Sequence, residues 1–381
     1  MIIYLSILFL LLFCILEYDI RGVKKYQDYF INLILLVLII VSGFSYRLGG
    51  DGMTYLNEWK YYGDISDLSY SYLTGFQGRM PGWVLLSTLC KTITSEYWFF
   101  KIIHAIILNI AYVYTIKRNA KYVFTGLLFY FVLIYFNQNF QLLRESMAIS
   151  FFFFGLPFYY SGKWFKYYLF ILLAISFHEG AAILIFLPIV KLLGINKYSV
   201  LFYLVLGVIM ILSASYILSY LTTIQIDGEL QGKIFHYTSK METDYVFTTF
   251  SNTILNVLIP LLILIYYKRK SVTINYLFPA IFGILLYVTS LVIPIAYRLS
   301  NYFLIFSYLI ITDFVSGMFL RRQRSILLLV IILSSFLLFK SRMYLLPYGE
   351  SGIPSYVQYY PYASIFDKDI DQERERLYRS N

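Results

Sequence analysis

Three side chains suited to proton transfer stand beside long apolar runs. His178 and Glu179 lie within residues 176–181, where one apolar run ends and another begins. An imidazole can accept a proton near neutral pH, so His178 is a candidate general base, with Glu179 orienting the attacking group or serving as the base itself. The alternative is a structural histidine, hydrogen-bonded at a helix end. The third, Asp51, follows two glycines that let the backbone approach a ligand closely, although such a segment is most often a plain loop turn.

Three arginines, Arg47, Arg144 and Arg298, lie at the ends of apolar runs, and Arg79 precedes a shorter apolar stretch. A planar guanidinium makes paired hydrogen bonds to phosphate oxygens and keeps its charge in a low-dielectric pocket. An anionic ligand would therefore explain them. The alternative is that each arginine reaches the membrane interface or pairs with a neighbouring carboxylate.

Other reactive groups are sparse. Of the remaining histidines, we expect His104 to be structural, without a partner in its own apolar run, and His236 to be solvated in a loop. Two cysteines are too few for a disulfide framework or a metal site. The sequence shows no phosphate-binding loop, dinucleotide fingerprint or zinc-protease motif. We therefore expect no metal and no cofactor.

The elements that must position these residues are membrane helices. Of 381 residues, 60% are apolar and 14% charged, against roughly 25% charged in soluble chains. A helix needs about 20 apolar residues to cross the hydrocarbon core. The fold we predict is all-α, with about 12 transmembrane helices. Their expected ranges are 2–17, 29–46, 97–116, 122–137, 142–160, 164–177, 179–193, 198–220, 250–267, 274–294, 299–320 and 325–340.

The clusters of Lys and Arg between these runs predict the orientation. Basic residues near span ends mark the cytoplasmic side, and this accounts for the net charge of +10 without nucleic acid. The clusters fall on one side only if residues 81–93 form a re-entrant or surface helix that does not cross. These clusters lie at 21–25, 117–121, 163–166, 191–197, 268–270 and 321–324.

This topology divides the chain into a transmembrane helical domain, 1–340, and an extracytoplasmic tail, 341–381. The longer external loops would be 47–80 and 222–249, and both termini would lie outside. Most of the candidate residues then converge on the external face, whereas Asp313 lies within a span. On the external face, an arginine is not needed to set the topology.

Short motifs spread over the chain resemble the EpsG family, which belongs with the Wzy-type bacterial polysaccharide polymerases. The first runs from Arg47 through Gly50 and Asp51 to Tyr55. Later ones are Arg144 to Ala148, Phe177 to Ala181, and Arg298 to Phe303, which includes Tyr302; Pro361 to Phe366, with Tyr362, resembles the family's C-terminal aromatic motif. The chain departs from the family where it reads Arg79-Met80-Pro81-Gly82 in place of a Glu-Pro-Gly element, and where Gly180 replaces a serine.

The resemblance implies a multi-pass enzyme of the bacterial cytoplasmic membrane, with its active site facing outward. It would polymerise undecaprenyl-diphosphate-linked oligosaccharide repeat units into capsular, exopolysaccharide or O-antigen chains. His178, Glu179 or Asp51 would supply the base, and Arg47, Arg144 and Arg298 would hold the diphosphate. Tyr55, Arg79, Tyr302 and Tyr362 are further substrate-binding candidates. Membrane lipid, a chain-length regulator and a flippase are the other expected partners.

Other functions stay open at this point. A ligase that transfers finished glycan would use the same residues, and a transferase using a polyprenyl-phosphate sugar would use Asp51 as its base. A flippase for lipid-linked oligosaccharides, which is a transporter, predicts charged residues in mid-span around a central cavity. A membrane acyltransferase would need a basic site for coenzyme A, and the sequence shows none.

Overall fold

A computed structural model describes residues 2–193, 252–272, 274–290, 296–319, 344–346 and 352–379. Within these ranges the chain is mainly helical and no residue belongs to a strand, so the all-α prediction is confirmed there. The chain divides into two compact units, Met1–Ala182 with Val315–Asn381, and Ile183–Phe314. Several predictions lie outside the described residues: the spans 198–220 and 325–340, the loop 222–249, the residues Lys197 and His236, and the basic cluster 321–324.

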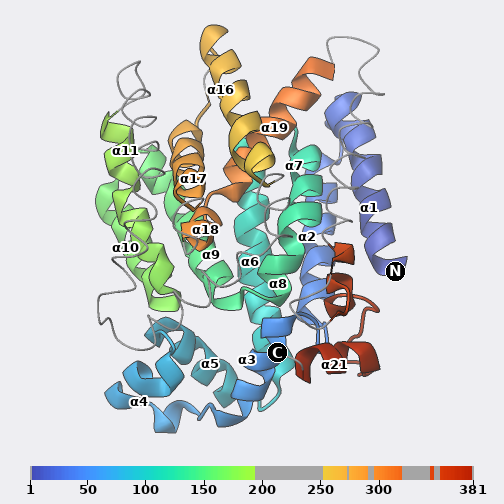
Figure 1. The fold of residues 1–381 in the computed structure, drawn as a ribbon, viewed down its shortest axis with the longest axis vertical. Coiled ribbons are helices and arrows are strands. Elements are labelled where there is room, and N and C mark those ends of the chain that lie inside the picture. Colours follow the sequence, from blue (N-terminus) through green and yellow to red (C-terminus); the bar gives the residue numbers. More distant parts are fainter. Residues whose placement is uncertain are drawn as a thin grey trace. The chain divides into compact units, whose positions relative to one another are not determined.

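The first unit contains most of the long apolar helices (Figure 1). Three are long and apolar enough to cross a membrane, Ile2–Ile20, Tyr97–Asn119 and Val123–Phe140, and two shorter apolar helices are Gln27–Gly43 and Trp164–Phe177. The predicted count of about 12 spans is not confirmed by these helices. Their elements are α1 (Ile2–Cys14) with η1 (Ile15–Ile20), α2 (Gln27–Gly43), α6 (Tyr97–Asn119), α7 (Val123–Phe129) continuing through η5 (Tyr130–Tyr135) into α8 (Phe136–Phe140), α9 (Leu143–Tyr160) and α10 (Trp164–Phe177).

Small residues let these helices approach closely. A Cβ on Gly43 of α2 would lie 3.1 Å from the Cα of Ile102 in α6, and one on Gly155 of α9 would lie 3.0 Å from Phe170 in α10. Residues 161–163 connect α9 to α10, with Gly162 at φ +70°. Because so short a connection joins long helices, α10 returns antiparallel to α9.

Three predicted cytoplasmic clusters meet at one end of this unit. Lys117 at the end of α6 forms an ion pair with Asp28 at the start of α2, with 2.8 Å between Nζ and Oδ1. The guanidinium of Arg118 lies 6.0 Å from the ring centre of Tyr160, which ends α9. Residues 21–25, 117–121 and 163–166 therefore lie together, and we call this the basic end.

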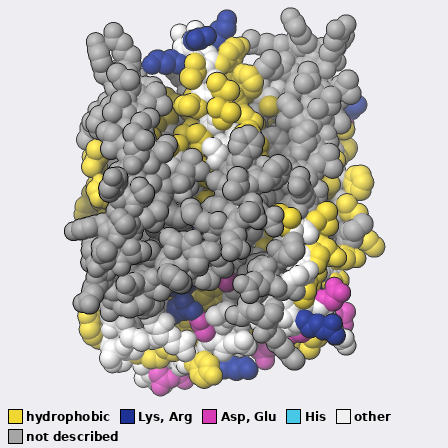
Figure 2. Space-filling model, viewed as in Figure 1, with side chains coloured by type: hydrophobic (Ala, Val, Ile, Leu, Met, Phe, Trp, Pro, Cys, Tyr) yellow, Lys and Arg dark blue, Asp and Glu magenta, His cyan; other side chains and the backbone are white. Residues whose placement is uncertain are grey.

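The opposite end of the first unit, which we call the loop end, carries α3 (Gly50–Glu58), α4 (Tyr70–Gly75), α5 (Pro81–Ile93), η8 (Ser355–Gln358) and α21 (Gln372–Arg379). Acidic side chains visible in Figure 2 gather at the level of α4, α5 and α21 in Figure 1. The predicted helix at 81–93 forms with these bounds, and its re-entrant or surface placement stays a prediction. The end of the chain packs here, since Tyr4 Oη donates to the carbonyl of Tyr359 at 3.0 Å.

The second unit contains part of η6 (Glu179–Phe186), then α11 (Leu187–Leu193), η7 (Ile254–Leu258), α16 (Ile259–Arg269), α17 (Leu277–Ser290), α18 (Ala296–Ser300) and most of α19 (Leu304–Phe319). The predicted single span 299–320 is wrong at its start, because a turn separates α18 from α19. In that turn the amide of Phe303 donates to the carbonyl of Ser300 at 2.9 Å. Phe303 then packs on Gly283, where a Cβ would come within 2.4 Å.

Candidate substrate-binding site

One face of α3 carries three polar residues. Asp51, Tyr55 and Glu58 follow each other at intervals of four and three residues, which places them on the same side of a helix. The helix starts after Gly49, whose φ of +82° favours glycine, and a Cβ there would lie 2.1 Å from the carbonyl oxygen of Phe140. The sequence suggested that the glycines approach a ligand. In the structure, Gly49 approaches the backbone of Phe140.

Arg79 closes over this face from the chain just before α5. Its Nε donates to Oε2 of Glu58 at 3.1 Å, and Nη2 donates to Oε1. The guanidinium also lies 5.7 Å from the ring centre of Tyr55. The Tyr55 ring packs against Trp83 at 5.1 Å between ring centres. Arg79 is therefore fixed by one carboxylate and one ring.

Arg144, in the first turn of α9, joins the same cluster. Its Nε donates to the hydroxyl of Tyr55 at 3.2 Å. Within the described ranges, no carboxylate oxygen lies within 4.0 Å of its guanidinium. The N-terminus of a helix repels cations, because the peptide dipoles give it a partial positive charge. A half-buried arginine at this position, without a carboxylate partner in that part of the chain, creates a local site for an anion.

Tyr55 adds a hydrogen-bond donor to the cluster. The side chain is buried, and burial raises the pKa of its phenol above the ordinary value. The hydroxyl therefore stays protonated at neutral pH. It accepts from Arg144 and can donate its own hydrogen to an oxygen of a bound ligand.

His104 holds the start of α9 in place. Its Nε2 lies 2.8 Å from Oγ of Ser146 and 3.1 Å from the carbonyl oxygen of Leu143. The ring is almost completely buried. The expected structural role fits this position, and, as expected, no partner comes from its own helix, since both partners belong to α9.

His178 lies where α10 ends. Its backbone is extended, with φ −152° and ψ 124°, and its amide still donates to the carbonyl of Ala174 at 3.1 Å. Glu179 begins η6 and is exposed. Gly82 of α5 packs against Ser176, where a Cβ would come within 2.3 Å of Oγ. The start of α5 therefore packs against the end of α10. Gly82 lies three residues after Arg79, and Ser176 lies two residues before His178.

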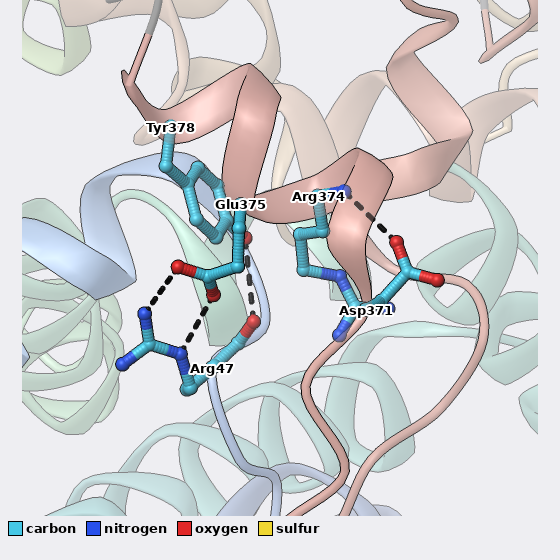
Figure 3. Close-up of polar contacts among 5 residues, drawn as sticks. All are labelled: Arg47, Asp371, Arg374, Glu375 and Tyr378. Carbon is cyan, nitrogen blue, oxygen red and sulfur yellow. Dashed lines mark hydrogen bonds and ion pairs between the residues drawn. The ribbon is translucent and has the colours of Figure 1, made fainter.

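Arg47 is held by the C-terminal tail (Figure 3). Its Nε and Nη2 donate to the two oxygens of Glu375 in α21 at 2.8 and 2.6 Å. These hydrogen bonds raise the pKa of the Arg47 guanidinium. Tyr378 donates to the carbonyl of Arg47 at 3.3 Å, and buried Arg374 donates through Nε to the carbonyl of Val357 at 2.9 Å. Arg47 thus already has a bidentate carboxylate partner.

The remaining candidates have other surroundings. Tyr362 donates to the carbonyl of Val41 at 3.1 Å and contacts Tyr4 edge-on at 6.0 Å, so it attaches the tail to α1 and α2. Arg298 in α18 and buried Tyr302 belong to the second unit. In that unit Asp313 accepts a hydrogen bond from Tyr276 at 3.1 Å. The substrate-binding roles of Tyr362, Arg298 and Tyr302 stay predictions.

Sequence reasoning missed two charged residues of the loop end. Glu58 was not singled out within the predicted loop 47–80, although its spacing from Asp51 and Tyr55 would place all three on one face of a helix. Lys101 was included in the predicted span 97–116 without comment. A lysine near the start of an apolar helix, far from the basic end, is a candidate for an anion site in the same way as Arg144. Its amino group is buried and donates to the carbonyl of Asn139 at 3.0 Å.

The helices and this cluster define a helical membrane protein with cationic and aromatic residues gathered beside one end of its apolar bundle. Among curated proteins and among solved structures, none matches the chain. The EpsG family profile matches residues 28–364, nearly the whole chain. The protein therefore belongs to the EpsG family, a family of Wzy-type polysaccharide polymerases.

Proposed function

We propose that the protein is a glycosyltransferase of the bacterial cytoplasmic membrane. It joins undecaprenyl-diphosphate-linked oligosaccharide repeat units into capsular, exopolysaccharide or O-antigen chains at the outer face. Membership of the EpsG family supports this class of reaction. The observation that carries the proposal is Arg144, a half-buried guanidinium in the first turn of α9 with no carboxylate partner in the described ranges.

In this reaction the donor is a growing glycan attached to undecaprenyl diphosphate, and the acceptor is a single lipid-linked repeat unit. A hydroxyl of the acceptor attacks the anomeric carbon of the donor, and the bond from that carbon to the diphosphate breaks. Negative charge develops on the departing diphosphate. Arg144 and the hydroxyl of Tyr55 stabilise that charge, a task suited to preorganised donors. Arg298 and Arg47 are the further predicted diphosphate ligands, and Arg47 would have to exchange its contact with Glu375.

The proton of the attacking hydroxyl goes to His178 in the favoured scheme. Its place at the end of α10, near the packing of Ser176 against Gly82, supports a base at the same end as Arg144. Glu179 or Asp51 is the base if His178 is not. Asp51 shares its helical face with Tyr55, so it lies on the side from which Arg144 approaches.

The test is turnover of the purified protein on a defined lipid-linked repeat unit, with polymer length measured on gels. Arg144→Gln should lose about 10²- to 10³-fold in turnover, as expected for one preorganised donor. Arg144→Lys keeps the charge without the planar fork and should fall between that variant and the wild type. The control is Arg118→Lys at the basic end, which should elongate normally. Turnover of Arg144→Gln within threefold of wild type would refute the proposal. Movement of the lipid-linked repeat across liposomes without elongation would instead favour a flippase.

A further inference from the structure

A second charged site lies on a neighbouring side of α3. A pocket of about 330 Å³ is lined by residues of three segments: 45–60, from just after α2 into η2; 95–101, from just before α6 into its first turns; and 365–368 of the tail. On α3 itself the lining residues are Gly52 and Leu56, whereas Tyr55 and Glu58 face the arginine cluster. At 100° per residue these pairs lie on neighbouring sides of the helix. The pocket thus adjoins the site of Arg144, although neither Arg144 nor Tyr55 lines it.

Cations outnumber anions in the lining. Exposed Lys60 and Lys368 contribute two positive charges, buried Lys101 adds a third amino group, and Glu96 is the acidic lining residue. Arg47 also lines the pocket, but its charge is balanced by Glu375 and is therefore not counted in this excess. Because Arg47 is also a predicted diphosphate ligand, the pocket adjoins that predicted site. The excess of positive charge favours an anionic ligand.

Lys101 is the most informative of these residues. It is 4% exposed, and its amino group makes a hydrogen bond of 3.0 Å to the carbonyl of Asn139 and lies 5.2 Å from the ring centre of Phe140. In the parts of the chain that the structure describes, no carboxylate lies within 4.0 Å of it. An ammonium has three donors, and burying it without a counter-charge is costly. A bound anion would supply both an acceptor and a counter-charge.

The rest of the lining suits a sugar ring. Half-buried Tyr97 and Trp98 offer aromatic surface, Trp59 also lines the pocket although it is buried, and Ser45 and Ser95 add polar groups for hydroxyls. Trp59 is held rigidly, because its indole nitrogen donates to the carbonyl of Ser95 at 2.7 Å and its ring meets Tyr97 at 5.5 Å. An acyl chain would gain little from three lysines. The volume lies at the low end of the range of about 300–1,000 Å³ typical of small-molecule sites, so the pocket holds one small ligand and not a polymer.

We infer that this pocket binds an anionic monosaccharide unit, with its carboxylate or other acidic group on Lys101 and its apolar ring face on the aromatic side chains. The biological ligand would be an acidic sugar within the repeat unit, an assignment that rests on the proposed function. The pocket would then select repeat units by charge, next to the predicted diphosphate ligand Arg47. Lys60 and Lys368 at the rim attract the anion, and Lys101 fixes its position.

The test measures binding and does not depend on polymerisation. Purified full-length protein in nanodiscs is titrated with D-glucuronate, with D-glucose as the neutral match, by saturation-transfer NMR. Glucuronate should bind at least tenfold more tightly than glucose. Lys101→Met should weaken glucuronate by about 10- to 100-fold, the usual contribution of a hydrogen bond to a charged group. Lys166→Gln, at the basic end, should bind like the wild type.

Two further measurements test whether the pocket binds glucuronate through its lysines. If Lys101→Met does not fold, the double variant Lys60→Gln/Lys368→Gln changes only exposed residues and should still weaken glucuronate several-fold. Equal binding of glucose and glucuronate would overturn the inference, as would wild-type binding in both variants. Inorganic phosphate that binds in place of glucuronate would point to a lipid phosphate and overturn the sugar assignment. Because Arg144→Gln should keep glucuronate binding, failure of this site and failure of the polymerase proposal give different results.

Discussion

The two ends of the first unit hold their charged residues in different surroundings. At the basic end, the side chains of Lys117 and Asp28 are 49% and 75% exposed, although they form an ion pair. At the loop end, the pairs are well covered: Arg79 and Glu58 are 18% and 12% exposed, and Arg47 and Glu375 are 21% and 20% exposed. A charge that only marks the cytoplasmic side needs to be near the interface, and exposure costs it nothing.

Half-buried guanidinium groups need partners, and the loop end supplies them from distant parts of the chain. Glu58 and Glu375 are the carboxylates for Arg79 and Arg47. Arg144 differs, because its contact is the neutral hydroxyl of Tyr55 and no carboxylate pairs with it in the described ranges. The comparison therefore separates three kinds of basic residue in one unit: exposed charges at the basic end, covered charges paired with carboxylates, and Arg144, which we propose binds a ligand.

The first experiment tests whether the basic residues mark the cytoplasmic side, and it has the largest expected effect. In intact spheroplasts, cysteines at Asp64 and Tyr360 should react with an impermeant thiol reagent, whereas cysteines at Lys117 and Arg269 should react only after lysis. Labelling of the native cysteines should be low, since Cys14 and Cys90 are buried and burial raises the pKa of Cys90 to about 11. Reaction at Lys117→Cys or Arg269→Cys before lysis would show that the basic residues do not mark the inside. A cysteine at position 235, outside the described residues, should react like position 64.

The second experiment tests the base at the loop end. His178→Ala should lose about 10²- to 10⁴-fold in turnover per folded molecule, because the acceptor hydroxyl then has no positioned base. Lipid-linked single repeats should accumulate in the membrane. His104→Ala is the comparison, since its ring joins α6 to α9, and it should mainly lower the amount of folded protein. If His178→Ala keeps more than a tenth of wild-type turnover, the base is Glu179 or Asp51.

The third experiment concerns the paired charges. Glu375→Gln leaves the Arg47 guanidinium partly buried without its carboxylate, and should destabilise the protein by about 1–3 kcal/mol. Thermal unfolding of the purified protein measures this loss. Glu373→Gln, on the exposed side of the same helix, is the matched control and should change stability little. Equal shifts in the two variants would mean that the contact between Arg47 and α21 contributes no stability.

The fourth experiment has the smallest expected effect. Lys117→Gln removes the exposed ion pair with Asp28, and such pairs contribute about 0–1 kcal/mol. Unfolding temperature and turnover should both stay close to the wild-type values. A loss as large as that of Glu375→Gln would remove the distinction between exposed and covered pairs.

Local sequence signals predicted several apolar helices of the first unit, whereas α3, α4 and α21 fall within segments predicted as external loop or tail. The side on which basic clusters fall predicted a separate short helix at 81–93, and the structure has α5 with these bounds. Pro81 can begin this helix because a backbone N–H in the first turn has no acceptor within the helix. Proline, which lacks that N–H, therefore loses no hydrogen bond there. The break at residues 301–303 was missed, because Tyr302 and Phe303 continue the apolar pattern while the turn depends on packing against Gly283.

The site depends on contacts that no local pattern contains. The type and position of Arg144 suggested an anion, but its contact with Tyr55 joins residues 89 positions apart. Glu375 lies 328 positions from Arg47, and the sequence predicted an extracytoplasmic tail without indicating which residues it contacts. The pocket that Lys101 helps to line was not predicted, because an apolar helix with one lysine has the pattern of a membrane span.

Residues 352–379 also set an order of events in biosynthesis. Chains are made from the N-terminus, so α21 emerges after all the helices that it contacts have left the ribosome. Until then Arg47 lacks the carboxylate of Glu375, and the tail side of the pocket is missing. A segment synthesised after those helices therefore completes the loop end, and a chain released before α21 would lack Glu375 as the partner of Arg47.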